Sequence, residues 1–342
     1  MREPFVTVVI PTKNSAKTLE KCLQSLVNQE YKDFEIIVVD GHSKDNTVEI
    51  AKKYTHSVFY ENYGTRAAGC NIGIRQAHGE IVAFTDDDCE VPKDWLREIA
   101  SKFEDDTLDV LGGSTITPNE SSKMEKAFGV IQNHIKPLTY SRGAYEKVAG
   151  CNSAYRKKAL VEVGGFNDTL PYVEEQELQF RLKQTGKKIE YIDHLFVLHN
   201  PRTTIRQFWK QHFNYGLGKG KWIRSNPSAI KASNILVQLL IFGPFILLPI
   251  LAIANLFILY CTVLGFAVAL LALSFYVSLK VHQIFLFPFA VLASILWVYS
   301  EGLGQLKGFL SRTQMAEQMV GSFATGLEDT EFSQYSSNFS EN

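Results

Sequence analysis

The chain has 342 residues, with 35 Lys and Arg against 36 Asp and Glu, and 46% of its residues are apolar. A net charge of -1 excludes the positive field that recruits nucleic acid, and a charged fraction of 21% excludes a disordered, charge-rich chain. Residues 232–279 contain no Asp, Glu, Lys, Arg or His, and these 48 residues are about twice the ~20 that cross a bilayer as a helix. We therefore expect a membrane protein with a large water-exposed head.

Strands and helices alternate in the first third of the chain. Apolar runs at 5–10, 34–40, 58–60 and 80–86 predict strands, and apolar residues at helical spacing between them predict helices. This alternation is typical of a doubly wound, mostly parallel sheet in an α/β fold. Two of the runs end in Asp40 and Asp86. Because such sheets bind ligands at the carboxyl ends of their strands, we expect a site there.

The pattern is less regular between Gly112 and His199, where we expect a helix over 174–183 and a strand over 189–192. Aromatic and basic residues are then mixed through 203–231. This mixture is typical of helices that lie at a membrane interface, and an ordinary amphipathic surface helix is the alternative.

The uncharged run predicts two spans, at about 234–254 and 257–279, and residues 284–300 are long enough for a third. Basic residues precede the first span and follow the second, which places the head in the cytoplasm. Three spans would put the tail outside, but Lys307 and Arg312 argue against that, so two to four spans stay open. The expected parts are a head domain (1–200), interface helices (201–232), about three transmembrane helices (233–303) and a partly disordered tail (304–342).

An acidic cluster follows the fourth apolar run, at Asp86, Asp87 and Asp88. Three adjacent carboxylates repel one another unless a cation lies among them. If the strand continues, Asp86 and Asp88 point to the same side and can hold one divalent ion. Mg²⁺ or Mn²⁺ bound in this way completes its shell with phosphate oxygens. A solvated acidic turn is the alternative.

Several segments, taken together, resemble family 2 glycosyltransferases with the GT-A fold: VVIPTKN at 8–14, IIVVDGHSKDNT at 36–47 and FTDDD at 84–88. GGF at 164–166 and EEQELQFRL at 174–182 match the acceptor half of the same family. The similarity extends over about residues 5–215. Within the family, the chain looks most like membrane-bound enzymes of the succinoglycan glucosyltransferase type, which build polysaccharides and lipid-linked glycans of the cell envelope.

The resemblance implies a nucleotide-sugar site whose donor-binding residues are Pro11, Thr12, Asn14, Asp40, Arg66, Asn71 and Asp86. Asp40 would accept hydrogen bonds from the base, most often uracil. Arg66 and Asn71 would flank the ribose or the diphosphate. Asp45 follows the same motif, but its spacing to Thr47 is equally typical of an ordinary turn.

The resemblance also implies a divalent cation, Mg²⁺ or Mn²⁺, held by Asp88 with Asp86. Its task would be to offset the charge that grows on the departing nucleoside diphosphate. His199 resembles a later histidine that completes the metal shell in some relatives. A structural role for this histidine is the alternative.

A base must take the proton of the acceptor hydroxyl, and Glu174 and Glu175 are the candidates. Family members usually carry Glu-Asp at this point, with the second acid as the base, so we predict Glu175. The extra methylene of Glu leaves Glu174 open as the alternative. A charged helix start favoured by the helix dipole is a further interpretation. Glu177 and Arg181 lie four residues apart and are expected to pair.

These residues predict an inverting, metal-dependent hexosyltransferase that moves a sugar from a UDP- or GDP-sugar to a hydroxyl of a polyprenyl-linked or polysaccharide acceptor. We expect a multi-pass protein of the cell membrane with a cytoplasmic catalytic domain and no nucleic-acid partner. A carboxylate base favours a hydroxyl over a phosphate acceptor, because a phosphate is already an anion. The alternatives are a polyprenyl-phosphate monosaccharide synthase of the dolichyl-phosphate type and a non-catalytic membrane scaffold. Residues 206–210, RQFWK, lack the Gln-x-x-Arg-Trp of processive synthases, which favours single addition.

Overall fold

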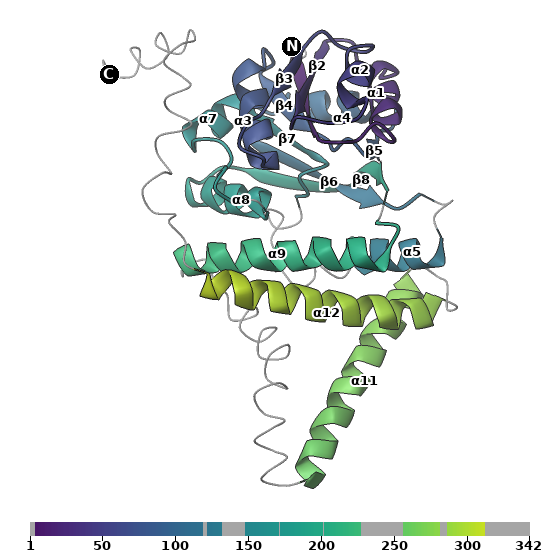
Figure 1. Ribbon diagram of the computed structural model, residues 1–342. Coiled ribbons are helices and arrows are strands. Elements are labelled where there is room, and N and C mark those ends of the chain that lie inside the picture. The colour runs from purple at the N-terminus through teal and green to yellow at the C-terminus, as the bar shows by residue number, and fades with distance from the viewer. Residues whose placement is uncertain are drawn as a thin grey trace. The chain divides into compact units, whose positions relative to one another are not determined.

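The computed structural model describes residues 4–118, 122–131, 148–170, 172–200, 202–226, 256–280 and 286–311. They form two compact units (Figure 1). The first comprises the chain up to Ser114 together with Lys147–Val197, and the second comprises Thr115–Glu146 and Leu198–Ser311. The division falls inside one strand, β8 (Ile189–His199), which belongs to the sheet of the first unit.

The first unit is built on an eight-stranded sheet with the order β3-β2-β1-β4-β7-β6-β8-β5. The other strands are β1 (Val6–Thr12), β2 (Phe34–Asp40), β3 (Val58–Tyr60), β4 (Ile81–Phe84), β5 (Cys89–Glu90), β6 (Val110–Ile116) and β7 (Ser153–Arg156). Strands β1 to β4 pair in parallel, whereas β7 pairs antiparallel with both β4 and β6. The predicted α/β fold is confirmed. The sheet is mixed, and its parallel half is the region where strands and helices alternate in the sequence.

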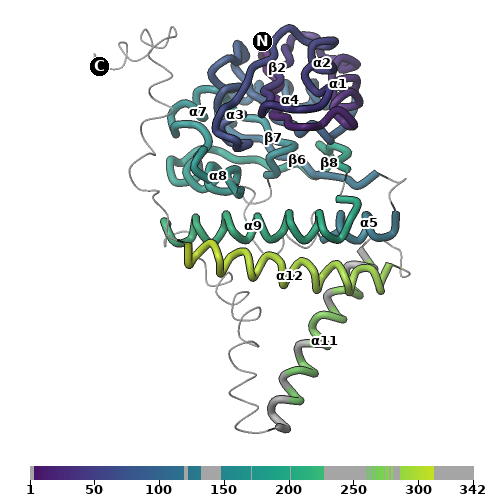
Figure 2. The backbone as a smooth tube through the Cα atoms, in the orientation of Figure 1, coloured from purple at the N-terminus to yellow at the C-terminus, as the bar shows by residue number. Residues whose placement is uncertain are grey.

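Helices cover both faces of this sheet (Figure 2). Helices α1 (Leu19–Val27), α2 (Thr47–Ala51) and α4 (Trp95–Lys102) pack on the face to which Val8 and Ile10 point. Helices α3 (Arg66–Gln76), α7 (Lys157–Glu162) and α8 (Glu174–Gln184) pack on the face to which Val9 points. Because successive side chains of a strand point to opposite faces, one continuous apolar run in β1 supplies both hydrophobic cores.

Asn152 connects the strands of the antiparallel half. Its Oδ1 accepts a hydrogen bond from Trp95 Nε1 at 2.9 Å, and its Nδ2 donates to the carbonyls of Ser114 at 2.8 Å and Leu195 at 2.9 Å. A Cβ atom at Gly113 would lie 2.0 Å from the carbonyl oxygen of Leu195, so only glycine allows this approach of β6 to β8. These contacts hold together a region whose sequence pattern is irregular.

The second unit contains α5 (Lys123–Val130), α9 (Ile205–Ser225), α11 (Leu256–Lys280) and α12 (Phe287–Leu310). Helix α9 lies within the predicted interface segment. Among the described residues, α12 alone is long and apolar enough to cross a membrane, judged by length and composition, and a shorter apolar stretch lies inside α11. Helix α11 corresponds to the predicted span at 257–279, and α12 extends the predicted third span to Leu310. The predicted span at 234–254 and most of the tail lie outside the described residues.

Candidate functional site

Most of the predicted donor-binding residues lie at the carboxyl ends of the parallel strands, where β1 ends at Thr12 and β2 ends at Asp40, whereas Arg66 and Asn71 lie on α3. Among the described residues, the non-glycine residues with a positive φ are Asn14 (55°), His42 (57°) and Val173 (62°). Asn14 and His42 lie two residues after the ends of β1 and β2, and Val173 precedes Glu174. Backbone strain of this kind clusters at binding and catalytic sites, and here it marks the edge that the sequence indicates.

Asp40 is buried, with 1% of its surface exposed, and it organises the loop that follows β2. Its Oδ2 accepts from the Ser43 amide at 2.9 Å and its Oδ1 from the Ser43 hydroxyl at 2.5 Å. The Asn14 amide donates to Ser43 Oγ at 2.7 Å, and the Lys44 amide donates to Asn14 Oδ1 at 2.8 Å. The loops after β1 and β2 are therefore joined, and the carboxylate of Asp40 is held rigidly between them.

Asp45 forms the ordinary turn that was the alternative for its motif. Its Oδ1 accepts from the Thr47 hydroxyl at 2.5 Å and the Thr47 amide at 3.2 Å, and its Oδ2 accepts from the Ala16 amide at 3.2 Å. These hydrogen bonds, that of the Thr47 hydroxyl foremost, hold the pKa of Asp45 below its usual value.

Glu61 is a buried carboxylate that the sequence interpretation missed. It follows β3 directly, has 5% of its surface exposed, and accepts from the amides of Tyr63 at 2.9 Å and Gly64 at 2.8 Å. A Cβ atom at Gly41 would lie 3.1 Å from Glu61 Oε1, so this carboxylate adjoins the end of β2. The position of Glu61 in the sequence could have indicated it, because an acidic residue directly after an apolar strand is typical of a ligand-binding site at this edge of the sheet.

The three aspartates of the acidic cluster diverge. Strand β4 ends at Phe84 and the cluster forms a turn, so the condition under which Asp86 and Asp88 would share one side, a continuing strand, is not met. Asp86 faces Arg66, whereas Asp87 accepts from Ser15 Oγ at 2.6 Å. Burial raises the pKa of Asp87 to about 6.

Arg66, at the start of α3, joins two of the predicted site residues. Its Nε and Nη2 donate to Asp86 Oδ1 at 3.0 and 2.8 Å, its Nη2 also donates to the Gly150 carbonyl at 2.9 Å, and its Nη1 lies 3.4 Å from Glu174 Oε1. Burial lowers the pKa of Arg66, but the nearby carboxylates, Asp86 foremost, raise it further than burial lowers it. The guanidinium therefore stays charged and links the acidic turn after β4 to the start of α8.

Helix α8 begins at the candidate base. Val173 precedes the helix with a left-handed backbone conformation, which a β-branched residue rarely adopts. This strained turn sets the orientation of the first residues of α8, Glu174 and Glu175. Glu174 is 4% exposed and Glu175 is half-buried. Further along α8, Arg181 Nε and Nη2 each donate to the Glu177 carboxylate at 2.7 Å, so the predicted pairing of these residues is confirmed.

Burial and the neighbouring Glu175 carboxylate raise the pKa of Glu174 to about 8, although Arg66 opposes this shift. Arg66 makes its shorter bonds to Asp86, and its 3.4 Å contact with Glu174 does not compensate for the desolvation of that carboxyl. At neutral pH Glu174 is therefore mostly protonated.

The raised pKa predicts that Glu174 makes stability depend on pH. The folded protein binds a proton at Glu174 that the unfolded chain releases near the usual glutamate pKa of 4.5, so stability falls as the pH rises from 4.5 to about 8. The slope contributed by this group is at most about 1.4 kcal/mol per pH unit. We expect Glu174→Gln to remove that slope, which melting temperatures of the wild type and the variant from pH 5 to 8 will show.

Glu104→Gln, at an exposed carboxylate, is the matched control and should keep the slope of the wild type. An unchanged slope in Glu174→Gln would contradict the assignment.

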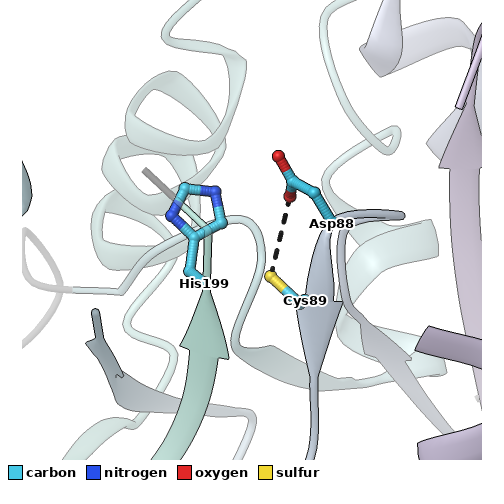
Figure 3. A group of neighbouring side chains, drawn as sticks. All are labelled: Asp88, Cys89 and His199. Atoms are coloured by element: carbon cyan, nitrogen blue, oxygen red, sulfur yellow. Dashed lines mark hydrogen bonds between the residues drawn. The ribbon is translucent and has the colours of Figure 1, made fainter. Parts of the chain in front are cut away.

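Asp88, Cys89 and His199 form a group that can bind a metal ion (Figure 3). One ligand atom from each lies within 4.8 Å of the others, because β5 and β8 are neighbours in the sheet and His199 ends β8. A carboxylate oxygen and an imidazole nitrogen fit a divalent ion such as Mn²⁺. The thiol of Cys89 is kept neutral, because a hydrogen bond with Cys151 and burial raise its pKa. The group contains two predicted ligands, Asp88 and His199, whereas Asp86 lies outside it and is bound by Arg66.

Asn71 faces away from this arrangement. Its Nδ2 donates to the Phe166 carbonyl and its Oδ1 accepts from the Phe166 amide, both at 2.8 Å. The side chain thus ties α3 to the loop before α8, and its predicted contact with the donor stays a prediction. Pro11 is half-buried beside Gly69, where a Cβ atom would lie 3.3 Å from Pro11 Cβ, and Thr12 is buried.

Comparison with known proteins finds similarity to glycosyltransferases in sequence and in fold. Residues 7–164 match the family model described as glycosyl transferase family 2. The chain is 29% identical over 229 residues to glycosyltransferase AglE of Haloferax volcanii, covering 63% of this chain and 73% of that protein. It is also 29% identical over 227 residues to the GalNAc(5)-diNAcBac-PP-undecaprenol beta-1,3-glucosyltransferase of Campylobacter jejuni subsp. jejuni, covering 64% and 70%. Several other relatives align over less than a third of their length.

The fold is similar to that of the mannosyltransferase PcManGT from Pyrobaculum calidifontis, solved in complex with GDP-Man and Mn²⁺. The TM-score is 0.60 at 19% identity, and the match covers 87% of this chain and 88% of that one. The chain therefore has a GT-A-like α/β fold, and its residues 7–164 are similar to glycosyltransferase family 2.

Proposed function

We propose that the chain is an inverting glycosyltransferase of the membrane surface. It transfers a sugar from a UDP- or GDP-sugar to a hydroxyl of a polyprenyl-linked or polysaccharide acceptor, with Mg²⁺ or Mn²⁺ at Asp88. The family 2 domain supports the reaction class. The Campylobacter jejuni relative, whose name gives an undecaprenol-linked acceptor, supports the acceptor class. The Pyrobaculum calidifontis structure supports a nucleotide sugar with Mn²⁺.

The observation that carries the proposal is the position of Arg66. It contacts Asp86 of the acidic turn and Glu174 at the start of α8, while Asp88 approaches His199 beside it. Arginine is well suited to phosphate, because its planar donors match the oxygens of a diphosphate. A permanently charged arginine between the two carboxylates therefore places a phosphate-binding group beside the candidate base.

The protein holds each part of the donor with a different group. Asp40, fixed by Ser43, offers carboxylate oxygens to the donors of a base edge. Arg66 orients the diphosphate, and Asp88 and His199 are the residues that would hold the cation. When bound, the cation offsets the negative charge of the departing diphosphate.

Glu175 is the base in this proposal. Glu174 is almost fully buried and contacts Arg66, which leaves it less accessible to an acceptor hydroxyl than Glu175. Glu175 follows the same strained turn, and because it is half-buried, its carboxylate is accessible to an acceptor. A carboxylate in this position is useful for deprotonating a hydroxyl, whereas a phosphate acceptor needs no base.

The test is sugar transfer in isolated membranes that contain the full chain. We expect label from a radioactive UDP- or GDP-sugar to enter organic-extractable lipid in the presence of Mn²⁺. Glu175→Gln should lower this rate by about 10²–10⁴-fold, and Glu104→Gln should leave it unchanged. If Glu175→Gln transfers at the wild-type rate while Asp88→Asn is inactive, a phosphate acceptor replaces the hydroxyl. If both variants transfer at the wild-type rate, the proposed chemistry is wrong.

A further inference from the structure

We infer that α12 does not cross the membrane but lies on its surface beside α9, so that the chain crosses twice between these helices and returns to the side of the catalytic domain. The inference rests on the proposed residence at the membrane. It concerns the second unit alone. Length and composition permit α12 to span a bilayer, but its contacts point to a surface position.

Glycines bring the backbones of α9 and α12 into contact. A Cβ atom at Gly216 of α9 would lie 2.0 Å from the Glu301 carbonyl oxygen, and one at Gly304 of α12 would lie 2.0 Å from the Phe213 carbonyl oxygen. Gly220 and Gly308 repeat this geometry one turn later, at 2.2 Å from opposing carbonyl oxygens. Small residues four apart on both helices allow such close packing. The two helices lie side by side in Figures 1 and 2.

The pairing extends along both helices, which run in the same direction. Near the start of α9, Phe208 packs in one apolar cluster with Ala290 and Ala293 of α12. Near the end of α9, Arg224 Nη1 donates to the carbonyls of Phe309 at 3.0 Å and Ser311 at 2.6 Å. Arg224 thereby caps the carboxyl end of α12. The contacts leave neither end of α12 free to diverge from α9.

Buried polar groups reinforce the same pairing. Glu301 of α12 is 6% exposed and accepts from Trp297 Nε1 at 2.6 Å. From α9, His212 Nδ1 lies 3.6 Å and Lys219 Nζ 3.9 Å from the Glu301 carboxylate. Separating the helices would leave Glu301 without these partners, at a cost of several kcal/mol in an apolar environment.

Helix α9 cannot be a span. Its 21 residues include five cationic side chains, Arg206, Lys210, Lys219, Lys221 and Arg224. Each costs about 2.5–3.5 kcal/mol at the centre of a membrane helix. Because α12 is bound to α9 along its length, α12 stays on the same side of the bilayer.

The segment between the two helices must therefore cross an even number of times. The uncharged residues 232–279 are long enough for two crossings. Helix α11 is the second, with 25 residues and exposed apolar side chains that include Val263, Val268, Leu271 and Phe275.

The paired helices present the two kinds of side chain that a bilayer surface with anionic lipids binds. Exposed apolar residues of α12 are Leu292, Leu303, Leu306, Phe309 and Leu310. On α9, Arg206, Lys210 and Arg224 are exposed. Apolar side chains enter the headgroup region, and the cations are attracted to anionic lipid phosphates. We therefore identify the partner of this surface as a phospholipid bilayer.

Single-cysteine labelling of the full chain in sealed cells tests the inference. The cysteines at 22, 70, 89 and 151 are buried, and Cys261→Ser removes the exposed one. A reporter is then added to the head (Ser101→Cys), to the connection between the predicted spans (Asn255→Cys) or to the tail (Ser340→Cys). A membrane-impermeant maleimide should label Asn255→Cys in intact cells, and Ser101→Cys and Ser340→Cys only after permeabilisation.

Labelling of Ser340→Cys in intact cells, with Ser101→Cys protected, would overturn the inference and make α12 a span. Protection of all three positions would also overturn it, since the chain would then not cross. Release of the full chain from membranes by alkaline carbonate would overturn it as well. None of these outcomes depends on catalysis, so they are distinct from failure of the transfer assay.

Discussion

Asp88→Asn is expected to lower sugar transfer by about 10²–10³-fold without unfolding the protein. Asp88 contributes the one carboxylate in the group with Cys89 and His199. An amide keeps the size of the side chain but removes the charge that binds a divalent ion. The measurement is the initial rate of transfer as a function of Mn²⁺ concentration, and higher Mn²⁺ should restore part of the lost rate.

Asp87→Asn is the matched control for Asp88→Asn, because it removes the adjacent carboxylate of the same turn. Asp87 accepts from Ser15 and lies outside the metal group, so its variant should keep the Mn²⁺ dependence of the wild type. If Asp87→Asn loses the response to Mn²⁺ while Asp88→Asn retains it, the cation is bound by different residues.

Arg66→Met is expected to destabilise the protein by about 3 kcal/mol, which lowers the melting temperature by roughly 6–12 °C. The methionine fills part of the space but leaves Asp86 without its two short hydrogen bonds and Glu174 without the Nη1 donor. Glu174 is almost fully buried, so water cannot replace the lost partner. Transfer should also fall, because the diphosphate loses a bidentate donor.

The melting temperature of Arg97→Met provides the comparison. Arg97 also pairs with a carboxylate, that of Glu30, but the side chains are 58% and 49% exposed. Exposed pairs contribute about 0–1 kcal/mol, so this variant should melt within a few degrees of the wild type. Equal losses in Arg66→Met and Arg97→Met would mean that Arg66 has no special role in joining the two halves of the site.

The pattern of short apolar runs in the sequence was sufficient to predict the parallel half of the sheet and the carboxyl ends of its strands. The runs at 34–40 and 58–60 coincide with β2 and β3, because each is a short apolar segment bounded by polar residues. The same reasoning located Asp40 at the end of β2. In the other half, the strand predicted at 189–192 lies within β8, but β6 and β7 were not predicted. That half is held together by contacts distant in sequence, such as those of Asn152 with Ser114 and Leu195.

The sequence identified the types of residue at the candidate site better than it identified the contacts between them. Strand periodicity suggested that Asp86 and Asp88 act together, but the turn after Phe84 directs Asp86 to Arg66 and Asp88 toward His199. The protonation of Glu174 depends first on burial, which no local pattern encodes, then on the adjacent Glu175, while Arg66, which is distant in sequence, opposes it. Likewise, the pairing of α12 with α9 depends on glycines about 85–90 residues apart in the sequence, so composition alone suggested a third span.

The binding of UDP and GDP to the purified full chain, measured with Mn²⁺ and again with a chelator, tests the central claim most directly. A cation at Asp88 that joins the protein to the diphosphate predicts that the chelator weakens binding of one nucleotide by at least about tenfold, or 1.4 kcal/mol. In Asp88→Asn the same nucleotide should bind equally weakly under both conditions. Wild-type affinity that is identical with and without the chelator for both nucleotides would contradict the account.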